Sequence, residues 1–528
     1  MRKSVFVTGV VALLGLSACG DQLSVTNLNN PDVERVLSTA VGIQATVAGF
    51  GSQLHNPQRA SESINTQAKI MAEESYASVA NFGMAARAAN RSLIINDLGN
   101  DHSTSNLANF NSFQRLARSA ANALSAFNNV KAADLNTLST ADENRMRAFA
   151  YLILGRAMAN VAVGYDSGAV ATEVITSEEI PGLVSAADLN VAAIAALDSA
   201  VIIAGRGMSD MPITYLSVTA PTTQAVFIRL ARSYRARARA AVARTPAERA
   251  AVNWAAVIAD ATNGISADHV IQVRGTTGWN GGFDVGQMYV SGGWHSYPMT
   301  FAGMADSSGG YQTWFNTLAD QRRAFLVQTR DRRWAQGSTR TLQQADTPTN
   351  SIFPRYIRNR PTGDDVVSPG TGESWYDHRR YGATNAVAVA GPYTELSKTE
   401  IDMLAAEGYI RTGLPASAEP LIDISRLRNN LPTVVGVGAA GTVSGGAACV
   451  PKLPNGTCGT LLDALKYEKR METAFTGYLV WFTDGRGWGD LPRNTAVEWP
   501  VPFQEMQARQ QPFYNGIRTS GATSTYGF

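Results

Sequence analysis

The stretch 461–506 constrains the fold of this chain more than any other part of the sequence. It opens with apolar residues at three- and four-residue spacing, a pattern that predicts a helix with one buried face. These residues are Ala464, Tyr467, Met471, Ala474, Phe475 and Tyr478. Glycines at 477, 485, 487 and 489 then interrupt an aromatic run that is too apolar for a solvated loop and too rich in glycine for a longer helix. We therefore expect this segment to pack against the rest of the chain.

The same stretch resembles the closing signature of the SusD/RagB family of nutrient-uptake outer membrane lipoproteins. That signature reads roughly ERR-x-EL-A-F-EG, then DL-x-RWG, then PIP-x-x-E. The matching residues are Glu468, Arg470, Glu472, Phe475, Gly477, Trp481, Asp484, Arg486, Trp488, Gly489, the run from Trp499 to Pro502, and Glu505. The sequence departs from the signature at Lys469, Thr476 and Gly485, which bears on local packing more than on the resemblance.

A second segment is similar to another element of the same family. Residues 395–430 predict two helices, with Gly413 ending the first and Pro415 setting the turn between them. This pair resembles the family's AE-x-Y…G…A…N-x-VR element. The matching residues are Glu407, Tyr409, Gly413, Ala418 and Arg428.

Two glutamates of the signature, Glu468 and Glu472, lie one helical turn apart beside the apolar stripe. Like charges at this spacing repel unless cations such as Arg470 or Arg486 neutralise them. We interpret the charged signature residues, with Asp484 and Trp488 beside them, as a structural network. A glycosidase needs two carboxylates that face each other across a cleft, so two groups on one helix favour that interpretation less.

The N-terminus has the pattern of an export signal. Arg2 and Lys3 precede an uncharged apolar run from Val5 to Leu16, which is shorter than the roughly 20 residues that a spanning helix needs. Small residues lead to Cys19, and the segment from Leu16 to Cys19 resembles a bacterial lipobox, in which that cysteine is lipidated. An ordinary cleavage site and an uncleaved anchor are the alternatives. No later segment reads as apolar and uncharged enough to span a bilayer, so attachment would depend on the lipid.

The other two cysteines, Cys449 and Cys458, flank a turn-rich loop and are close enough in sequence to form a small disulfide loop in an oxidising compartment. A zinc site needs more ligands, and no histidine lies nearby.

The net charge of +2 falls to zero once Arg2 and Lys3 are removed, which disfavours nucleic acid as a partner.

The segment 32–264 is rich in alanine and predicts a series of helices. The candidates span 32–50, 61–79, 109–126, 141–163, 186–204, 221–243 and 246–262. Thr140 with Glu143 reads as a capping box, Ser185 as an N-cap, and Pro221 and Pro246 as first-turn residues. Short connections imply antiparallel pairs, so we expect a mainly α fold, a helix-hairpin solenoid. The family resemblance implies irregular tetratricopeptide-like pairs in an α-α superhelix.

The segment 265–394 loses alanine and gains glycine, tryptophan and tyrosine, which predicts long loops with short strands. We expect it to be an insertion packed on the helices rather than a separate domain. The predicted organisation is a signal peptide (1–18), a lipidated tether (19–31) and one domain (32–528). That domain comprises helical repeats (32–264), the insertion (265–394), and C-terminal helices with the signature (395–528).

Motifs for catalysis, cofactors or metals are not found, so no catalytic residue, cofactor or metal is expected. The glycine pattern 436–441 matches a dinucleotide fingerprint by letter, but a turn-rich stretch follows where the helix should begin. The five histidines are interpreted as surface or packing residues; they are His55, His102, His269, His295 and His378. Seven arginines between 229 and 249 are interpreted as a solvated helix surface rather than a nucleic-acid site.

The aromatic residues offer a candidate ligand-binding surface. Tryptophan and tyrosine present broad apolar faces with a polar handle, which suits stacking against sugar rings. The candidates are Trp279, Trp294, Tyr297, Tyr311 and Trp314, with Tyr76, Asn81 and Phe82 as a second wall. Each ring taken singly is more often a core residue than a ligand platform.

The resemblance to the SusD/RagB family implies a lipoprotein at the cell surface, anchored in the outer membrane through Cys19. Such a protein captures oligosaccharides or peptides and passes them to a SusC-type TonB-dependent β-barrel transporter, which it covers as a lid. It breaks no bond. A surface glycoside hydrolase and a helical-repeat protein adaptor remain as alternatives.

Overall fold

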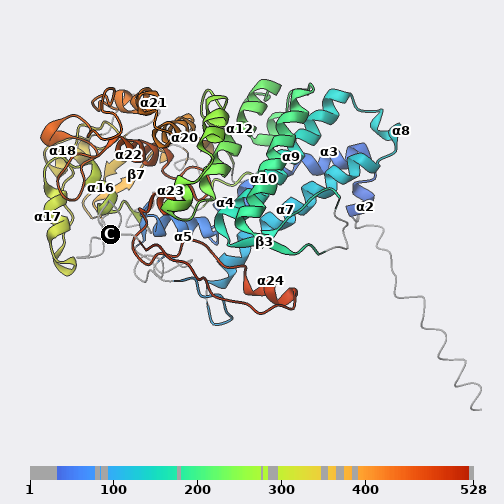
Figure 1. The fold of residues 1–528 in the computed structure, drawn as a ribbon, viewed down its shortest axis with the longest axis horizontal. Helices are drawn as coiled ribbons and strands as arrows, with labels where there is room; N and C mark the ends of the chain where they lie inside the picture. The colour runs from blue at the N-terminus through green and yellow to red at the C-terminus, as the bar shows by residue number, and fades with distance from the viewer. Residues whose placement is uncertain are drawn as a thin grey trace, which may run out of the picture.

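Helices dominate the first half of the molecule and lie side by side at one end of it (Figure 1). The computed structural model describes residues 33–77, 84, 93–100, 102–174, 180–274, 278–282, 295–346, 355–363, 374–382, 384 and 390–521. The lipobox, Cys19 and the tether lie outside the described residues, so those predictions stay predictions. The helices of this half are α2 (Val33–Val36), α3 (Ala40–Ala48), α4 (Phe50–Arg59), α5 (Ile64–Met71), α7 (Ser103–Asn129), α8 (Ala132–Leu135), α9 (Thr140–Gly164), α10 (Ala186–Gly205), α11 (Ile213–Leu216), α12 (Gln224–Ala241), α13 (Pro246–Ala250) and α14 (Trp254–Thr262).

Helix α9 lies at the centre of this half and packs against α7 and α10. Most of its residues are buried, because it is covered on several sides. A Cβ at Gly155 would lie 2.7 Å from Leu197 Cγ and 2.8 Å from Ala193 O of α10. Glycine at this position therefore lets the two helices approach closely.

Helices α9 and α10 also have the length and hydropathy of membrane spans, contrary to our expectation from the sequence. In α9, 78% of the apolar window is buried inside the protein, and in α10 44%. A buried core helix of a soluble protein passes the same test, so length and composition carry little weight here.

The predicted helix starts are partly correct. Ser185 caps α10 by accepting a hydrogen bond from Asp188 N (3.2 Å), and Pro246 occupies the first turn of α13. The predicted capping box at Thr140 is wrong, because Ser139 is the N-cap of α9 and accepts from Asp142 N. Pro221 precedes the N-cap of α12, which is Thr223, and so lies outside the helix.

Short strands and short helices fill the described parts of 265–394. Two strands, β4 (His269–Val273) and β8 (Gly391–Leu396), pair antiparallel from His269↔Leu396 to Val273↔Gly391. The chain therefore leaves the helical half and returns to it at neighbouring positions. The helices of this segment are α16 (Met299–Ala305), α17 (Gly310–Asn316), η2 (Ala319–Gln321) and α18 (Arg340–Ala345). The remaining strand pairs of the molecule are β1 (Tyr76–Ala77) with β5 (His295–Ser296), β2 (Ser167–Ala169) with β3 (Leu183–Ser185), and β6 (Ile357–Asn359) with β7 (Tyr376–His378).

Helices return after β8; Figure 1 shows α20, α21 and α22 at the other end of the molecule, whereas α24 lies below β3 in this view. They are α20 (Lys398–Arg411), α21 (Pro415–Arg428), η3 (Gly446–Ala448), α22 (Leu461–Thr473), α23 (Val480–Trp488) and α24 (Phe503–Ala508). The mainly α fold class predicted from the sequence is confirmed.

The glycine-rich part of the signature differs from the prediction, because α23 is a helix that contains Gly485 and Gly487. The break between α22 and α23 lies earlier, where Phe475, Gly477 and Leu479 all have positive φ. A Cβ at Gly485 would lie 2.9 Å from Leu491 Cδ2, and one at Gly487 3.1 Å from Arg249 Cδ. These two glycines permit close packing of a helix rather than ending it.

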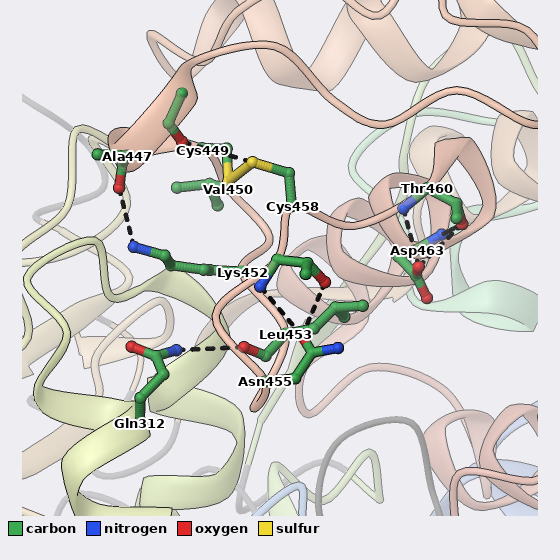
Figure 2. The surroundings of a disulfide bond; sticks show 12 residues. Gln312, Ala447, Cys449, Val450, Lys452, Leu453, Asn455, Cys458, Thr460 and Asp463 are labelled. Atoms are coloured by element: carbon green, nitrogen blue, oxygen red, sulfur yellow. Dashed lines mark hydrogen bonds between the residues drawn. A yellow bond between two sulfur atoms is a disulfide. The ribbon is translucent and has the colours of Figure 1, made fainter.

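Cys449 and Cys458 are joined by a disulfide that closes the loop before α22 (Figure 2). Inside the loop Leu453 N donates to Thr457 O (2.8 Å), and Gln312 of α17 donates to Leu453 O (3.1 Å). Thr460 and Asp463 form a capping box at the start of α22. The loop therefore fastens α17 to the start of the signature helix.

Candidate ligand-binding site

The signature carboxylates Glu468 and Glu472 are buried, with 0% and 2% of their surface exposed. Arg333 lies between them, with Nη1 2.9 Å from Glu468 Oε2 and 3.1 Å from Glu472 Oε1. Burial works to raise the pKa of Glu472, but the neighbouring arginines, Arg333 first, lower it to about 2. Burial raises the pKa of Glu468 in spite of its arginine partners.

The cations that neutralise these carboxylates differ from those expected. Arg470 pairs with Asp490 (3.0 Å), and Arg486 donates to backbone carbonyls, including Val497 O at 2.7 Å. Lys469, one of the departures from the signature, pairs with Asp484 (2.7 Å). The nearly complete burial of the two glutamates leaves a substrate no access to them.

The prediction that the arginine run is a solvated surface is wrong for five of its seven members. Arg249 is fully buried, with Nη2 2.5 Å from Glu407 Oε2 and 3.1 Å from Asp484 Oδ1. Arg237 forms a bidentate salt bridge with Glu400, in which Nε and Nη2 each donate a hydrogen bond of 2.7 Å. Arg235 and Arg239 pair with Asp260, and Arg244 with Glu498. These arginines join α12, α13 and the turn between them to residues more than a hundred positions away or to the adjacent α14.

Among the predicted ligand-binding aromatics, Trp279 is half-buried at a small pocket between α4 and β4. Its ring lies against α4, since a Cβ at Gly51 would be 2.9 Å from Trp279 Cζ2. The loop that carries it is fastened to the same helix: Asn56 donates to Gly278 O (2.7 Å) and accepts from Asn280 N (2.9 Å). The position of the indole is therefore set by the backbone on both sides of it.

Charged and aromatic side chains line the floor of this pocket. The ring centroid of His55 lies 5.4 Å from that of Trp279, and Glu395 binds Arg59 (3.2 Å) and Arg156 (3.0 Å). Burial lowers the pKa of His55 to about 4, so its imidazole is neutral at pH 7. Burial works to raise the pKa of Glu395, but Arg59 and Arg156 lower it to about 2, which keeps the carboxylate ionised.

Sequence reasoning missed Glu395 and Arg156 and treated His55 and His269 as packing or surface residues. Of the residues that line the pocket, Glu395 is the only carboxylate within the described part of the chain. The pocket has a volume of about 10 Å³, which is room for one water-sized group. A larger ligand would therefore lie across the exposed part of Trp279 and place only a hydroxyl in the pocket.

The other predicted binding residues are distributed differently. Tyr297, Tyr311 and Trp314 are buried and belong to a hydrophobic cluster, where Tyr297 packs edge-on against Trp334 (5.6 Å between centroids). Their contacts are those of core side chains. Tyr76 is half-buried on β1 and pairs with Ser296, which brings the two predicted walls together. Trp294, Asn81 and Phe82 lie outside the described residues.

No group of three or more histidine, cysteine, aspartate or glutamate side chains that could hold a metal ion is found within the described ranges. The pocket at Trp279 offers a flat apolar ring, a neutral imidazole and the carboxylate of Glu395, whose charge Arg59 and Arg156 neutralise. This arrangement can stack a ring and donate or accept hydrogen bonds.

No family model matches the sequence, and no curated protein matches it. Solved structures do. A SusD superfamily protein from Bacteroides thetaiotaomicron has a TM-score of 0.55 at 12% identity, with 90% of this chain and 98% of that chain covered. A SusD superfamily protein from Bacteroides vulgatus gives the same values. Surface glycan-binding protein A from Bacteroides thetaiotaomicron has a TM-score of 0.52 at 11% identity, with 92% and 100% covered.

At such low identity the similarity establishes the architecture, and it extends over almost the whole chain. The signature that suggested the SusD/RagB resemblance lies at the centre of the buried ion network and so is part of this architecture. The chain therefore has the fold of the SusD-like proteins.

Proposed function

We propose that this protein is a cell-surface glycan-binding lipoprotein that captures oligosaccharides and delivers them to a SusC-type TonB-dependent outer membrane transporter. The observation that carries the proposal is the half-buried Trp279, held over a pocket of hydrogen-bonding groups within a SusD-like fold. A flat ring beside polar groups is the usual arrangement for binding a sugar. The glycan-binding function of one structural neighbour points in the same direction.

The protein binds its ligand without breaking a bond. A glycoside hydrolase of the usual type needs two carboxylates about 5 to 10 Å apart, one on each side of the scissile bond. Glu395 has no second carboxylate beside it among the described pocket residues, and two arginines hold its pKa at about 2. Such a group is too weak a base, and has no proton to give at neutral pH, for acid and base catalysis.

Anchoring and delivery complete the proposal. Lipid on Cys19 holds the protein at the outer membrane, and the transporter receives the ligand beneath it. Purification of the full-length lipidated protein from its native membrane in detergent tests this part. A large β-barrel transporter should co-purify at near-stoichiometric yield, and recovery of the protein alone would contradict delivery to a transporter.

Ligand binding is tested with an oligosaccharide array, followed by calorimetry on each glycan retained. Trp279→Ala should weaken binding about five- to thirtyfold, because a stacking contact worth roughly 1–2 kcal/mol is lost. Trp375→Ala is the matched control, since Trp375 is also half-buried but lies beside Arg340, outside the pocket lining. Trp294→Ala tests the predicted residue of the neighbouring segment. Equal affinities for the wild type and the Trp279 variant would reject this site, and turnover of a bound glycan would favour the hydrolase.

A further inference from the structure

A second and larger cleft is lined by residues of α12, the end of α14, α20 and α21. Its volume is about 610 Å³, which is within the range of small-molecule binding sites. Ile228, Ile265 and Leu421 supply apolar walls. None of the residues that line this cleft also lines the Trp279 pocket, so the two are separate sites.

The floor of the cleft is held in place by short-range packing. Ser233 Oγ accepts a hydrogen bond from Ile265 N (2.9 Å) and donates to Arg229 O (2.9 Å), which ties the turn after α14 to α12. A Cβ at Gly264 would lie 2.6 Å from Ser233 Oγ and 2.9 Å from Ala261 O, so glycine is needed for this approach. The cleft is therefore bounded by fixed backbone rather than by long side chains alone.

The charges in the cleft are unbalanced. Arg229, Arg232 and Lys398 line it, and Asp402 is the single carboxylate among the described lining residues. Lys398 already pairs with Asp402, as neighbours one turn apart on α20. Three cations and one carboxylate leave a net charge of +2 (3 − 1).

Arg229 and Arg232 differ from the other arginines of the same run. The five that follow them form ion pairs with carboxylates, whereas these two have no carboxylate partner within the described ranges. They lie three residues apart on α12, so their side chains leave the same face of the helix. Two guanidinium groups with free donors in one cleft are suited to binding a planar or tetrahedral oxyanion.

We propose that this cleft binds the anionic group of a small soluble ligand, a carboxylate or a sulfate, between Arg229 and Arg232. The apolar walls contact the uncharged part of that ligand. The site is independent of glycan capture at Trp279, so either can fail without the other.

Calorimetry with three probes tests the proposal: sodium sulfate, a galacturonate trimer and neutral maltotriose. The purified wild-type chain should bind at least one of the two anions, with an affinity that falls as ionic strength rises. The double substitution Arg229→Gln and Arg232→Gln should weaken anion binding at least about tenfold. Binding of the trimer alone would assign a carboxylate ligand, and binding of sulfate alone a sulfated one.

Arg115→Gln is the matched control, because Arg115 is an exposed arginine on α7, outside this cleft. This variant should bind each anion with the affinity that the wild type shows. A second variant, Arg232→Glu, reverses the charge and should abolish binding, and circular dichroism on each variant verifies folding. The proposal would be overturned if the wild type bound neither anion, or if the double variant bound an anion as tightly as the wild type. Binding of neutral maltotriose that depends on the two arginines would also overturn it.

Discussion

His55 shows how a single buried side chain couples this pocket to pH. Its Nε2 contacts the carbonyl oxygen of Asn280 (2.8 Å), so this nitrogen carries the proton and donates it. Its Nδ1 lies 3.8 Å from Glu395, whose negative charge raises the pKa of the imidazole. The positive charges of Arg59 and Arg156 lower that pKa. Burial outweighs the carboxylate and lowers the pKa of His55 to about 4.

We predict that the free energy of unfolding falls as the pH is lowered from about 6.5 towards 4, partly because of His55. An unfolded imidazole, with a pKa near 6.5, takes up a proton in this range, but the folded one does not. Protonation therefore favours the unfolded state by an amount on the order of 2–3 kcal/mol at pH 4. Urea unfolding at pH 7, 5.5 and 4.5 measures the slope. His55→Gln keeps a donor but has no titration, so its stability should change less over the same interval; identical slopes for the two proteins would contradict the prediction.

At the scale of whole elements, close helix packing depends on small residues placed where helices meet. We predict that Gly155→Ala destabilises the protein by about 1–3 kcal/mol, although alanine favours a helix more than glycine does. The added Cβ would come within 2.8 Å of the carbonyl oxygen of Ala193, which belongs to the backbone of α10 and cannot move by itself. Thermal unfolding followed by circular dichroism measures the loss.

Gly205→Ala provides the comparison for this variant. Gly205 is the last residue of α10, and no atom apart from its chain neighbours and the nearby backbone of its own helix lies within 4 Å of a Cβ built there. Its substitution should leave stability unchanged or raise it by up to about 1 kcal/mol. If both variants behaved alike, the contact between α9 and α10 would not be the cause.

The elements themselves were predicted from the sequence to very different degrees. Helices α9 and α10 were predicted from alanine-rich runs, and α10 also from its N-cap Ser185, which are local signals. Helix α23 was not predicted, because its glycines fit neighbours such as Arg249 that are distant in the sequence. For the same reason the sequence did not identify Arg333 as the partner of Glu468, since the two are 135 residues apart and only the fold brings them together.

The candidate site was predicted only in part. Trp279 was expected from composition and is half-buried at a pocket, whereas Tyr297 and Tyr311 have the same residue chemistry but lie in the core. An aromatic residue buried in a core and one that faces a ligand have the same local pattern, so their difference arises from tertiary contacts alone.

Across the whole molecule, buried ion pairs connect parts that are far apart in the sequence. Arg59 of α4 reaches Glu395 of β8, Arg249 of α13 reaches Glu407 of α20, and Arg333 of the loop-rich segment reaches Glu468 of α22. The pairing of β4 with β8 further holds both ends of that segment beside the helices. Removing one partner from such a buried pair typically costs 3–5 kcal/mol. The parts therefore stabilise one another.

We predict from these connections that the chain from the first helix onward unfolds in one cooperative transition, in keeping with the single domain inferred from the sequence. Differential scanning calorimetry should give one peak whose calorimetric and van't Hoff enthalpies agree, which is uncommon for a chain of this length.

Arg333→Gln should lower stability by about 3–5 kcal/mol, because Glu468 and Glu472 would be left buried without their shared cation. Arg355→Gln, which removes a partly exposed pair with Asp346 in the same segment, should cost less than about 1 kcal/mol. Two separate peaks in the wild type would instead show that the loop-rich segment folds independently, because its ion pairs would then be too weak to couple it to α22.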